Sequence, residues 1–260
     1  FPNDTPVLGR DKDPGVVSDI NRFKLWGRKT SWNLLTSPGL RVMTRLIYPK
    51  STISHFHIGD NVVAFTIDDG FCGLDNLEGC MIEEVRELFK SYDAKATFFI
   101  TGSHYNEDLQ FDIELLLADG HELAHHNMMD WSYADYSEQD FKIDFDQASN
   151  ILNIYTSNTL KWYRAPFGRL SKTMQKVLDD NSMIHVVSDA FANDTAIPDP
   201  EWISKFILRK VKPGSIVLIH MPEKGVREWN FEAIRLTLEG LSKKGIKIVT
   251  VSELNSMKNN

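Results

Sequence analysis

From residue 62 onward, short apolar runs alternate with longer stretches in which apolar residues recur every three or four positions. Short apolar runs bounded by polar turns predict buried strands, and the longer spacing predicts amphipathic helices. The predicted strands are residues 62–67, 96–100, 122–124, 160–163, 184–187, 215–219 and 246–251. The helices predicted between them are residues 77–92, 109–118, 137–152, 170–178, 200–211 and 230–243.

This alternation predicts an α/β fold. Strands that are apolar throughout and joined by helices form parallel sheets covered on both faces. About seven such strands fit either a (β/α) barrel or an open doubly wound sheet. Residues 1–58 differ, because they show little periodicity and contain five prolines, Pro2, Pro6, Pro14, Pro38 and Pro49. We interpret 1–58 as an N-terminal extension packed on a domain formed by residues 59–260.

Composition narrows the class of protein. The chain has 260 residues, of which 42% are hydrophobic and 25% charged, as in an ordinary soluble globular protein. Its net charge of −7 argues against nonspecific binding of nucleic acid or anionic membranes, whereas neutral sugars remain suitable partners. No apolar run approaches the roughly 18 residues of a membrane span.

Polar side chains follow five of the predicted strands. In chain order they are Asp68 and Asp69, His126 and Asp130, Arg164, Asp189, and His220. The carboxyl ends of the strands in a parallel barrel share one rim, and catalytic residues come from that rim. We therefore expect these residues to form one site.

The residue types at this rim suit metal-assisted hydrolysis. Asp69, His126 and Asp130 offer oxygen and nitrogen donors for a divalent transition metal. Since His126 and Asp130 are four residues apart, one helical turn would point both side chains the same way. Attack of water on a carbonyl needs a general base, for which we choose Asp68, and an acid for the leaving group, for which we choose His220.

Further residues are assigned supporting roles. Arg164 and Asp189 are interpreted as groups that orient a base or a histidine. Four aromatic residues either stack on sugar rings or simply pack in the core, namely Trp131, Tyr163, Phe167 and Trp229. Three other histidines are interpreted as structural, namely His121, His125 and His185.

Five segments between about residues 60 and 254 resemble the motifs of the polysaccharide deacetylase family (carbohydrate esterase family 4), which includes chitin and peptidoglycan deacetylases. They are Thr66-Ile67-Asp68-Asp69-Gly70, Gly120-His121-Glu122-Leu123-Ala124-His125-His126, Tyr163-Arg164-Ala165-Pro166-Phe167-Gly168, Ser188-Asp189 and Leu218-Ile219-His220. The resemblance implies a distorted barrel of about seven strands. It also implies a divalent metal, with zinc expected and cobalt or manganese as alternatives, and an acetylated aminosugar polymer or oligomer as substrate.

The same resemblance implies a role for single residues. The first aspartate of the first motif, Asp68, would be the base, and the second, Asp69, would bind metal. The third motif, with Tyr163 and Pro166, would line the substrate groove. The aspartate of the fourth motif, Asp189, would contact Arg164. His220 would be the catalytic acid.

The chain departs from the family pattern at Asp130, where the second motif normally ends in a second histidine; a subgroup of the family carries Asp there. An additional carboxylate favours harder metals and makes a coordinated water less acidic. Two alternatives to a deacetylase that cleaves an amide bond stay open. One is a family member that binds glycan without hydrolysis, and the other is a related barrel acting on a small amide or ester.

Some features leave their interpretation open. Cys72 and Cys80 either form a disulfide or remain free thiols. Asn193-Asp194-Thr195 fits a glycosylation pattern that often arises by chance. Because the chain begins at Phe1, we expect that a preceding segment was removed. A polysaccharide substrate favours a secreted or cell-surface location, and we expect a monomer.

Overall fold

A computed structural model describes residues 22–37, 39–156 and 160–259. Its centre is one sheet of eight strands in the order β5-β4-β3-β2-β1-β7-β6, with β8 paired to β1. Every pairing in it is parallel. The strands are β1 Val62–Gly70, β2 Ala96–Ile100, β3 Glu122–His125, β4 Trp162–Tyr163, β5 Ile184–His185, β6 Ala190–Phe191, β7 Ile216–His220 and β8 Lys247–Val249.

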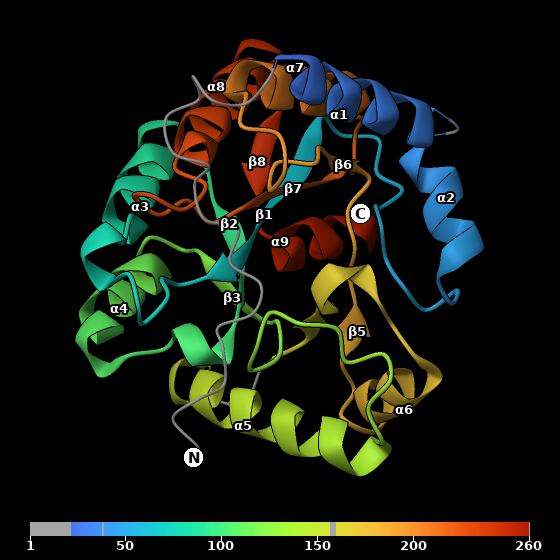
Figure 1. The fold of residues 1–260 in the computed structure, drawn as a ribbon, viewed down its shortest axis with the longest axis vertical. Coiled ribbons are helices and arrows are strands. Elements are labelled where there is room, and N and C mark those ends of the chain that lie inside the picture. Colours follow the sequence, from blue (N-terminus) through green and yellow to red (C-terminus); the bar gives the residue numbers. More distant parts are fainter. Residues whose placement is uncertain (1–21, 38, 157–159, 260) are drawn as a thin grey trace.

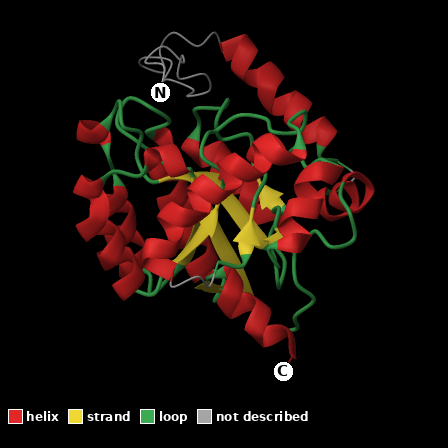
Figure 2. Ribbon diagram, turned by 90° about the horizontal axis from the view of Figure 1, so that it is seen from below, coloured by secondary structure: helices red, strands yellow, loops and turns green. Residues whose placement is uncertain are grey.

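Helices surround this sheet, so the strands lie in the interior of the molecule (Figures 1 and 2). The helices are α1 Arg22–Leu35, α2 Leu40–Ile47, α3 Ile82–Ser91, α4 Gln110–Ala118, α5 Glu138–Thr156, α6 Lys172–Asp180, α7 Pro200–Lys210, α8 Trp229–Lys243 and α9 Val251–Ser256. Within the described residues, none of them is long and apolar enough to cross a membrane.

β1 pairs with three other strands, β2, β7 and β8, and all nine of its residues are buried. Burying each large apolar side chain contributes about 1.5–3 kcal/mol, so its apolar half, residues 62–67, is a main source of fold stability. The last three residues of the strand are Asp68, Asp69 and Gly70. The packing of the apolar half therefore holds two carboxylates in the interior.

The predicted distorted barrel is confirmed, with eight strands of which three have only two residues. The terminal strands β5 and β6 are not paired with each other in the described sheet. The segment before β1 contacts the sheet near this gap, because Ile53 bridges to Val186, directly after β5, and His55 bridges to Ser215, directly before β7. This approach requires a glycine at position 214, where a β-carbon would lie 2.0 Å from the Phe56 carbonyl oxygen.

Several predicted boundaries need correction. The extension 1–58 contains two helices in its described part, α1 and α2, although its sequence shows little periodicity; residues 1–21 and Pro38 lie outside the described residues. The last strand ends at Val249, because the Thr250 hydroxyl accepts a hydrogen bond from the Glu253 amide and caps a helix there. The predicted strand 184–187 is shorter, and a separate strand, β6, follows it.

Cys72 and Cys80 form a disulfide, which decides between the two alternatives left open by the sequence. Cys72 is fully buried and lies two residues after Gly70, where β1 ends. The bridge therefore closes a short loop directly beyond the two aspartates of β1.

Removing this bridge should destabilise the protein without changing its fold. Because the closed loop is short, we expect the double variant Cys72→Ser/Cys80→Ser to lose about 2–3 kcal/mol of unfolding free energy. Urea denaturation of the oxidised wild type and the variant measures the difference. The wild type under reducing conditions should behave like the variant, and equal stability of all three would contradict the prediction.

Candidate active site

The carboxyl ends of the strands bring the predicted site residues together. Asp68 of β1 is the register partner of His220 of β7, so these two residues lie side by side. His126 directly follows β3, and its backbone N–H bonds to the carbonyl oxygen of Ile100, the last residue of β2. A cavity of about 520 Å³ opens over these strand ends, and every predicted strand-end residue except Asp189 lines it, namely Asp68, Asp69, His126, Asp130, Arg164 and His220.

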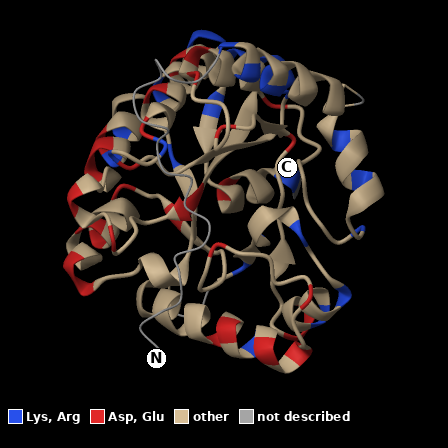
Figure 3. Cartoon of the chain, viewed as in Figure 1, with Lys and Arg blue, Asp and Glu red and all other residues tan. Residues whose placement is uncertain are grey.

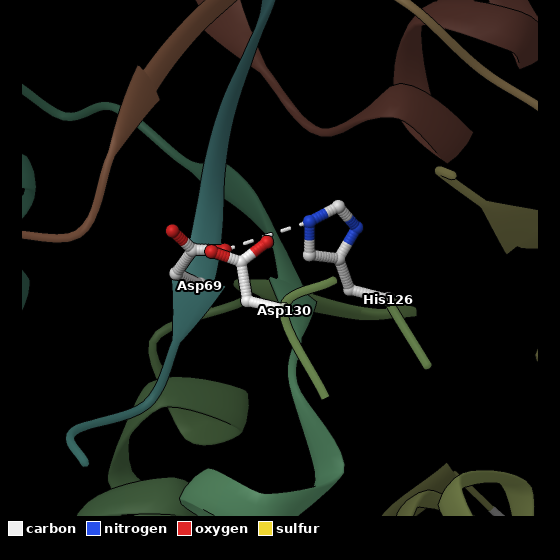
Figure 4. A group of neighbouring side chains, drawn as sticks. All are labelled: Asp69, His126 and Asp130. Carbon is white, nitrogen blue, oxygen red and sulfur yellow. Dashed lines mark ion pairs between the residues drawn. The ribbon is translucent and has the colours of Figure 1, made fainter. Parts of the chain in front are cut away.

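Three of these side chains form a candidate metal centre. Ligand atoms of Asp69, His126 and Asp130 all lie within 4.8 Å of one another. The three side chains point toward a common centre, and Asp69 Oδ1 is 3.5 Å from His126 Nε2 (Figure 4). Within the part of the chain that the structure describes, no other three His, Cys, Asp or Glu residues meet this criterion.

Hydrogen bonds leave the metal-binding atoms of this group available. The Nδ1–H of His126 donates to the Arg164 carbonyl oxygen at 2.8 Å, which leaves the Nε2 lone pair directed at the centre. Asp69 Oδ1 is buried and has no hydrogen-bond donor. An unsatisfied buried carboxylate oxygen beside an imidazole nitrogen fits a divalent cation such as zinc, cobalt or manganese.

The charges at the centre differ in how they are compensated. Burial would raise the pKa of Asp69, but Arg227, with smaller contributions from His126 and His220, outweighs it and holds the pKa well below its usual range. Burial, followed by repulsion from Asp69, raises the pKa of Asp130 to about 7. Two neighbouring carboxylates of this kind favour a cation between them.

The segment that carries His126 and Asp130 is a loop, so the expected helical turn is wrong. Asn127 adopts a positive φ of 63°, a conformation that is uncommon for a residue other than glycine. The Asp144 carboxylate of α5 holds the loop, because it accepts hydrogen bonds from the Asn127 side chain at 2.8 Å and the Met128 amide at 3.0 Å. This loop, instead of a helical turn, therefore directs the side chains of His126 and Asp130 to the centre.

Asp68 lies beside the metal centre and is held by Arg164. The guanidinium donates to Asp68 Oδ1, and its Nη1 also contacts the Thr66 hydroxyl at 2.9 Å. Its Nε donates to the Val186 carbonyl oxygen, and the group stacks 4.0 Å above the Phe99 ring. The second oxygen of Asp68 is 4.0 Å from His126 Nε2, so this oxygen faces the centre.

His220 is paired with Asp194, a residue that the sequence did not indicate. Its Nδ1 donates to the Asp194 carboxylate at 3.0 Å, and its backbone amide donates to the same group at 2.8 Å. Burial lowers the pKa of His220, but Asp194 outweighs burial and raises it to about 9. His220 is thus protonated at neutral pH, with Nε2 left for the cavity.

Asp189 does not occupy its predicted place. Its carboxylate accepts hydrogen bonds from Arg41, the Ser215 hydroxyl and the Ile216 amide, and among the described residues it forms no hydrogen bond or ion pair with Arg164. Asp189 therefore joins α2 to the start of β7, which is a structural role. Arg164 instead contacts the Asp68 carboxylate directly.

The aromatic and proline candidates are also distributed differently from expectation. Tyr163 is fully buried in an aromatic cluster with Phe141 and Phe145, so it offers no surface to a substrate. Pro166 is buried, Trp131 is half-buried, and neither lines the cavity. Phe167 lines the cavity and is 66% exposed. The Nε1 of Trp229 donates to the Asp194 carbonyl oxygen.

The three histidines interpreted as structural lie away from the centre. His121 accepts a hydrogen bond from the Ala96 amide, and His125 donates to the Phe145 carbonyl oxygen. Burial lowers the pKa of both residues to about 4. Burial also lowers the pKa of His185, to about 3. Each of them is therefore a neutral core residue.

Sequence reasoning missed two residues of the site, Asp194 and Arg227. Asp194 follows β6. The other site residues were found because they follow predicted strands, so Asp194 would have been found in the same way if β6 had been predicted. Arg227 donates to Asp69 Oδ2 at 2.8 Å and is buried, but it lies in the loop between β7 and α8. A single arginine in a loop carries no signal of this contact.

Comparisons with known proteins identify relatives of this chain in sequence and in fold. A family model described as polysaccharide deacetylase matches residues 57–184. A peptidoglycan-N-acetylglucosamine deacetylase from Bacillus cereus is 26% identical over 75% of this chain and 88% of its own length. An acetyl xylan esterase from Clostridium thermocellum, solved with cobalt, is 25% identical with a TM-score of 0.67, over 76% of this chain and 92% of its own.

A second solved structure shares the fold but is described as that of a pseudoenzyme. It is a carbohydrate esterase family 4 pseudoenzyme from Bacillus anthracis, 21% identical with a TM-score of 0.68, over 80% of this chain and 69% of its own. The fold by itself therefore does not establish activity. The family model matches residues 57–184 and the Bacillus cereus relative aligns over 75% of the chain, and the chain belongs to the polysaccharide deacetylase family.

Proposed function

We propose that this protein is a metal-dependent hydrolase that removes N-acetyl groups from an aminosugar polymer or oligomer. The observation that carries the proposal is the convergence of Asp69, His126 and Asp130, with Asp68 and His220 beside them. The peptidoglycan-N-acetylglucosamine deacetylase from Bacillus cereus and the chitooligosaccharide deacetylase from Sinorhizobium fredii support this class of substrate.

In this proposal each residue has a defined task. A divalent metal held by Asp69, His126 and Asp130 would supply Lewis acidity toward the acetyl carbonyl. Asp68 accepts the proton of the attacking water, and Arg164 fixes the orientation of its carboxylate. His220, protonated and held by Asp194, donates a proton to the departing amine nitrogen.

The walls of the cavity suit a sugar with apolar faces. Trp32, Leu40 and Met43 from the N-terminal helices line one part, and Phe191 from β6 lines another. Phe167 stands exposed among the lining residues, where an aromatic ring can stack on a pyranose. The N-terminal extension thus contributes to the proposed substrate site.

The proposal is tested by acetate release from chitin oligomers. Protein stripped with a chelator is supplied with zinc, cobalt or manganese, and acetate is measured for each metal. We expect release with at least one metal and none with the stripped protein. Acetate from small esters but not from oligomers would indicate the small-substrate barrel instead, and no acetate from any acetylated glycan with any metal would refute the proposal.

The pairing of His220 with Asp194 predicts a pH effect. A histidine whose pKa is raised to about 9 is protonated below that pH and loses its acid form as pH rises through it. In Asp194→Asn the negative partner is gone, so the pKa of His220 should fall. We expect the alkaline limb of the profile of kcat/KM against pH to move toward neutral pH. A bound dication would lower the pKa of His220 in the wild type and in the variant alike, so the difference between the two proteins remains measurable. An alkaline limb at the same pH in both proteins would exclude His220 as the acid.

We also propose a secreted or cell-surface location. The Cys72–Cys80 disulfide supports this location, because disulfides persist mainly in oxidising compartments. Processing of the protein in its source cells, followed by fractionation of medium and cell envelope, tests it.

A further inference from the structure

Helices α1 and α2 carry an unusual concentration of exposed apolar side chains. Seven of the thirteen exposed large hydrophobic residues in the described ranges fall between residues 23 and 47, namely Phe23, Trp26, Leu34, Leu35, Val42, Leu46 and Ile47. Trp26 is 61% exposed, Leu34 70% and Leu46 82%. Contiguous apolar surfaces of this kind mark interaction sites, whereas isolated exposed residues need no explanation.

The inner faces of the same helices are fixed to the barrel, so the outer faces keep a defined orientation. In α1, the Trp32 ring packs on Phe191 at 5.4 Å and Lys29 pairs with Asp199. In α2, Arg41 pairs with the buried Asp189 at 2.6 Å. Trp26 and Leu34 are eight residues apart and lie on one side of α1, about opposite Trp32.

Charge on this surface is opposite to that of the rest of the chain. Residues 22–59 contain seven Lys and Arg and no Asp or Glu, although the whole chain has a net charge of −7. Lys29 and Arg41 pair with aspartates of the barrel and Arg28 bonds to the Ala196 carbonyl oxygen, whereas the other four, Arg22, Lys24, Arg45 and Lys50, are exposed. Figure 3 shows basic residues along α1 and α2 and acidic residues gathered on α3 and α5. The net charge therefore hides a strongly basic segment. The expectation that the acidic chain avoids anionic membranes does not apply to this face.

We propose that the outer faces of α1 and α2 dock on an anionic lipid bilayer, with Trp26, Leu34, Val42 and Leu46 inserted at the headgroup level. Helices that combine Trp and Leu with Lys and Arg lie in the plane of the membrane interface. Each basic residue near an anionic surface adds attraction, and tryptophan favours the interface itself. Arg45 is exposed beside Leu46, where it would contact lipid phosphates.

The position of the catalytic cavity agrees with this surface. Leu35 and Ile47 belong both to the exposed set and to the lining of the cavity. The cavity therefore opens next to the docking face, and a docked protein would present its mouth close to the bilayer. Docking does not depend on the proposed catalysis, so a binding assay remains informative even if no deacetylation is found.

The experiment is co-sedimentation of the full chain with vesicles of phosphatidylcholine alone or of phosphatidylcholine and phosphatidylserine in equal parts. The variants are Leu46→Ser and Trp26→Ser for the apolar contacts and Arg45→Glu for the charge. Matched controls are Phe111→Ser, an exposed apolar residue of α4, and Lys205→Glu, an exposed basic residue of α7. All of these side chains are exposed, so circular dichroism should be unchanged.

We expect the wild type to bind the anionic vesicles at least about tenfold more tightly than the neutral ones, given several basic residues at the surface. Each of the three variants should weaken binding about tenfold, and both controls should leave it unchanged. No binding to either vesicle, or binding that the three variants do not alter, would overturn the proposal. A wild-type dimer in sedimentation velocity that Leu46→Ser dissociates would also overturn it, because the face would then bind a second copy.

Discussion

Replacement of Asp68 by Asn is expected to lower deacetylation by about 10²- to 10⁴-fold, the contribution of a well-placed general base. Asparagine has nearly the shape of aspartate, and its carbonyl oxygen can still accept the hydrogen bond from Arg164. It cannot accept a proton from water. The candidate metal ligands are untouched, so metal binding should be kept. Measurement of kcat and KM on chitin oligomers, together with metal content, separates the two effects.

The control for this variant is Asp146→Asn, which changes an aspartate on α5 that is paired with Lys142 at the surface. It should leave activity unchanged. If Asp68→Asn keeps full activity, another group is the base and the proposed role of Asp68 is wrong. If neither the wild type nor Asp68→Asn releases acetate while both bind glycan equally, the hypothesis of a glycan-binding family member gains support.

Replacement of Arg227 by Gln is expected to destabilise the metal-free protein by about 3–5 kcal/mol. Arg227 is buried, and its Nη1 is 2.8 Å from Asp69 Oδ2. Asp69 and Asp130 both lie near it, and Asp69 contributes most to raising the pKa of Arg227 against the effect of burial. Without this cation the buried Asp69 carboxylate and the half-buried Asp130 carboxylate lose their compensation. Urea denaturation in the presence of a chelator measures the loss.

The same variant should bind a divalent metal more tightly than the wild type, because the guanidinium repels a cation at the centre. Addition of zinc should therefore restore much of the stability lost by Arg227→Gln, and titration calorimetry should give a lower Kd. The control is Arg235→Gln, which removes a surface arginine paired with Glu232 and should change stability by less than about 1 kcal/mol. Equal stability of Arg227→Gln and wild type without metal would show that Arg227 does not balance these carboxylates.

Arg227 also bears on the departure of this chain from the family pattern. Asp130 stands where the second motif normally has a histidine, which adds one negative charge to the centre. A buried arginine bonded to the neighbouring candidate ligand Asp69 supplies one positive charge in return. We therefore interpret Arg227 as the compensation that allows a carboxylate at position 130.

Much of the site was predictable because strands have short-range signals. The apolar run before Asp68 and Asp69 and the run before His220 are both visible in the sequence, and parallel pairing places their ends on one rim. The weak point was the region after β5. There the strand is two residues long, and a second two-residue strand, β6, follows it. The residue assigned to this strand end was therefore Asp189 instead of Asp194.

The sequence by itself determined the α/β fold, the family, and most of the charged residues of the candidate site, because apolar periodicity and strand-end position are local properties. Tertiary structure alone decided the partners of those residues. Contacts such as those of Arg227 with Asp69, Asp194 with His220, and α1 with the barrel join segments far apart in the chain. Such contacts leave no periodic pattern, since each depends on the packing of the whole sheet. For the same reason a net charge of −7 concealed the basic face of α1 and α2, because the sum of the charges does not record where they lie.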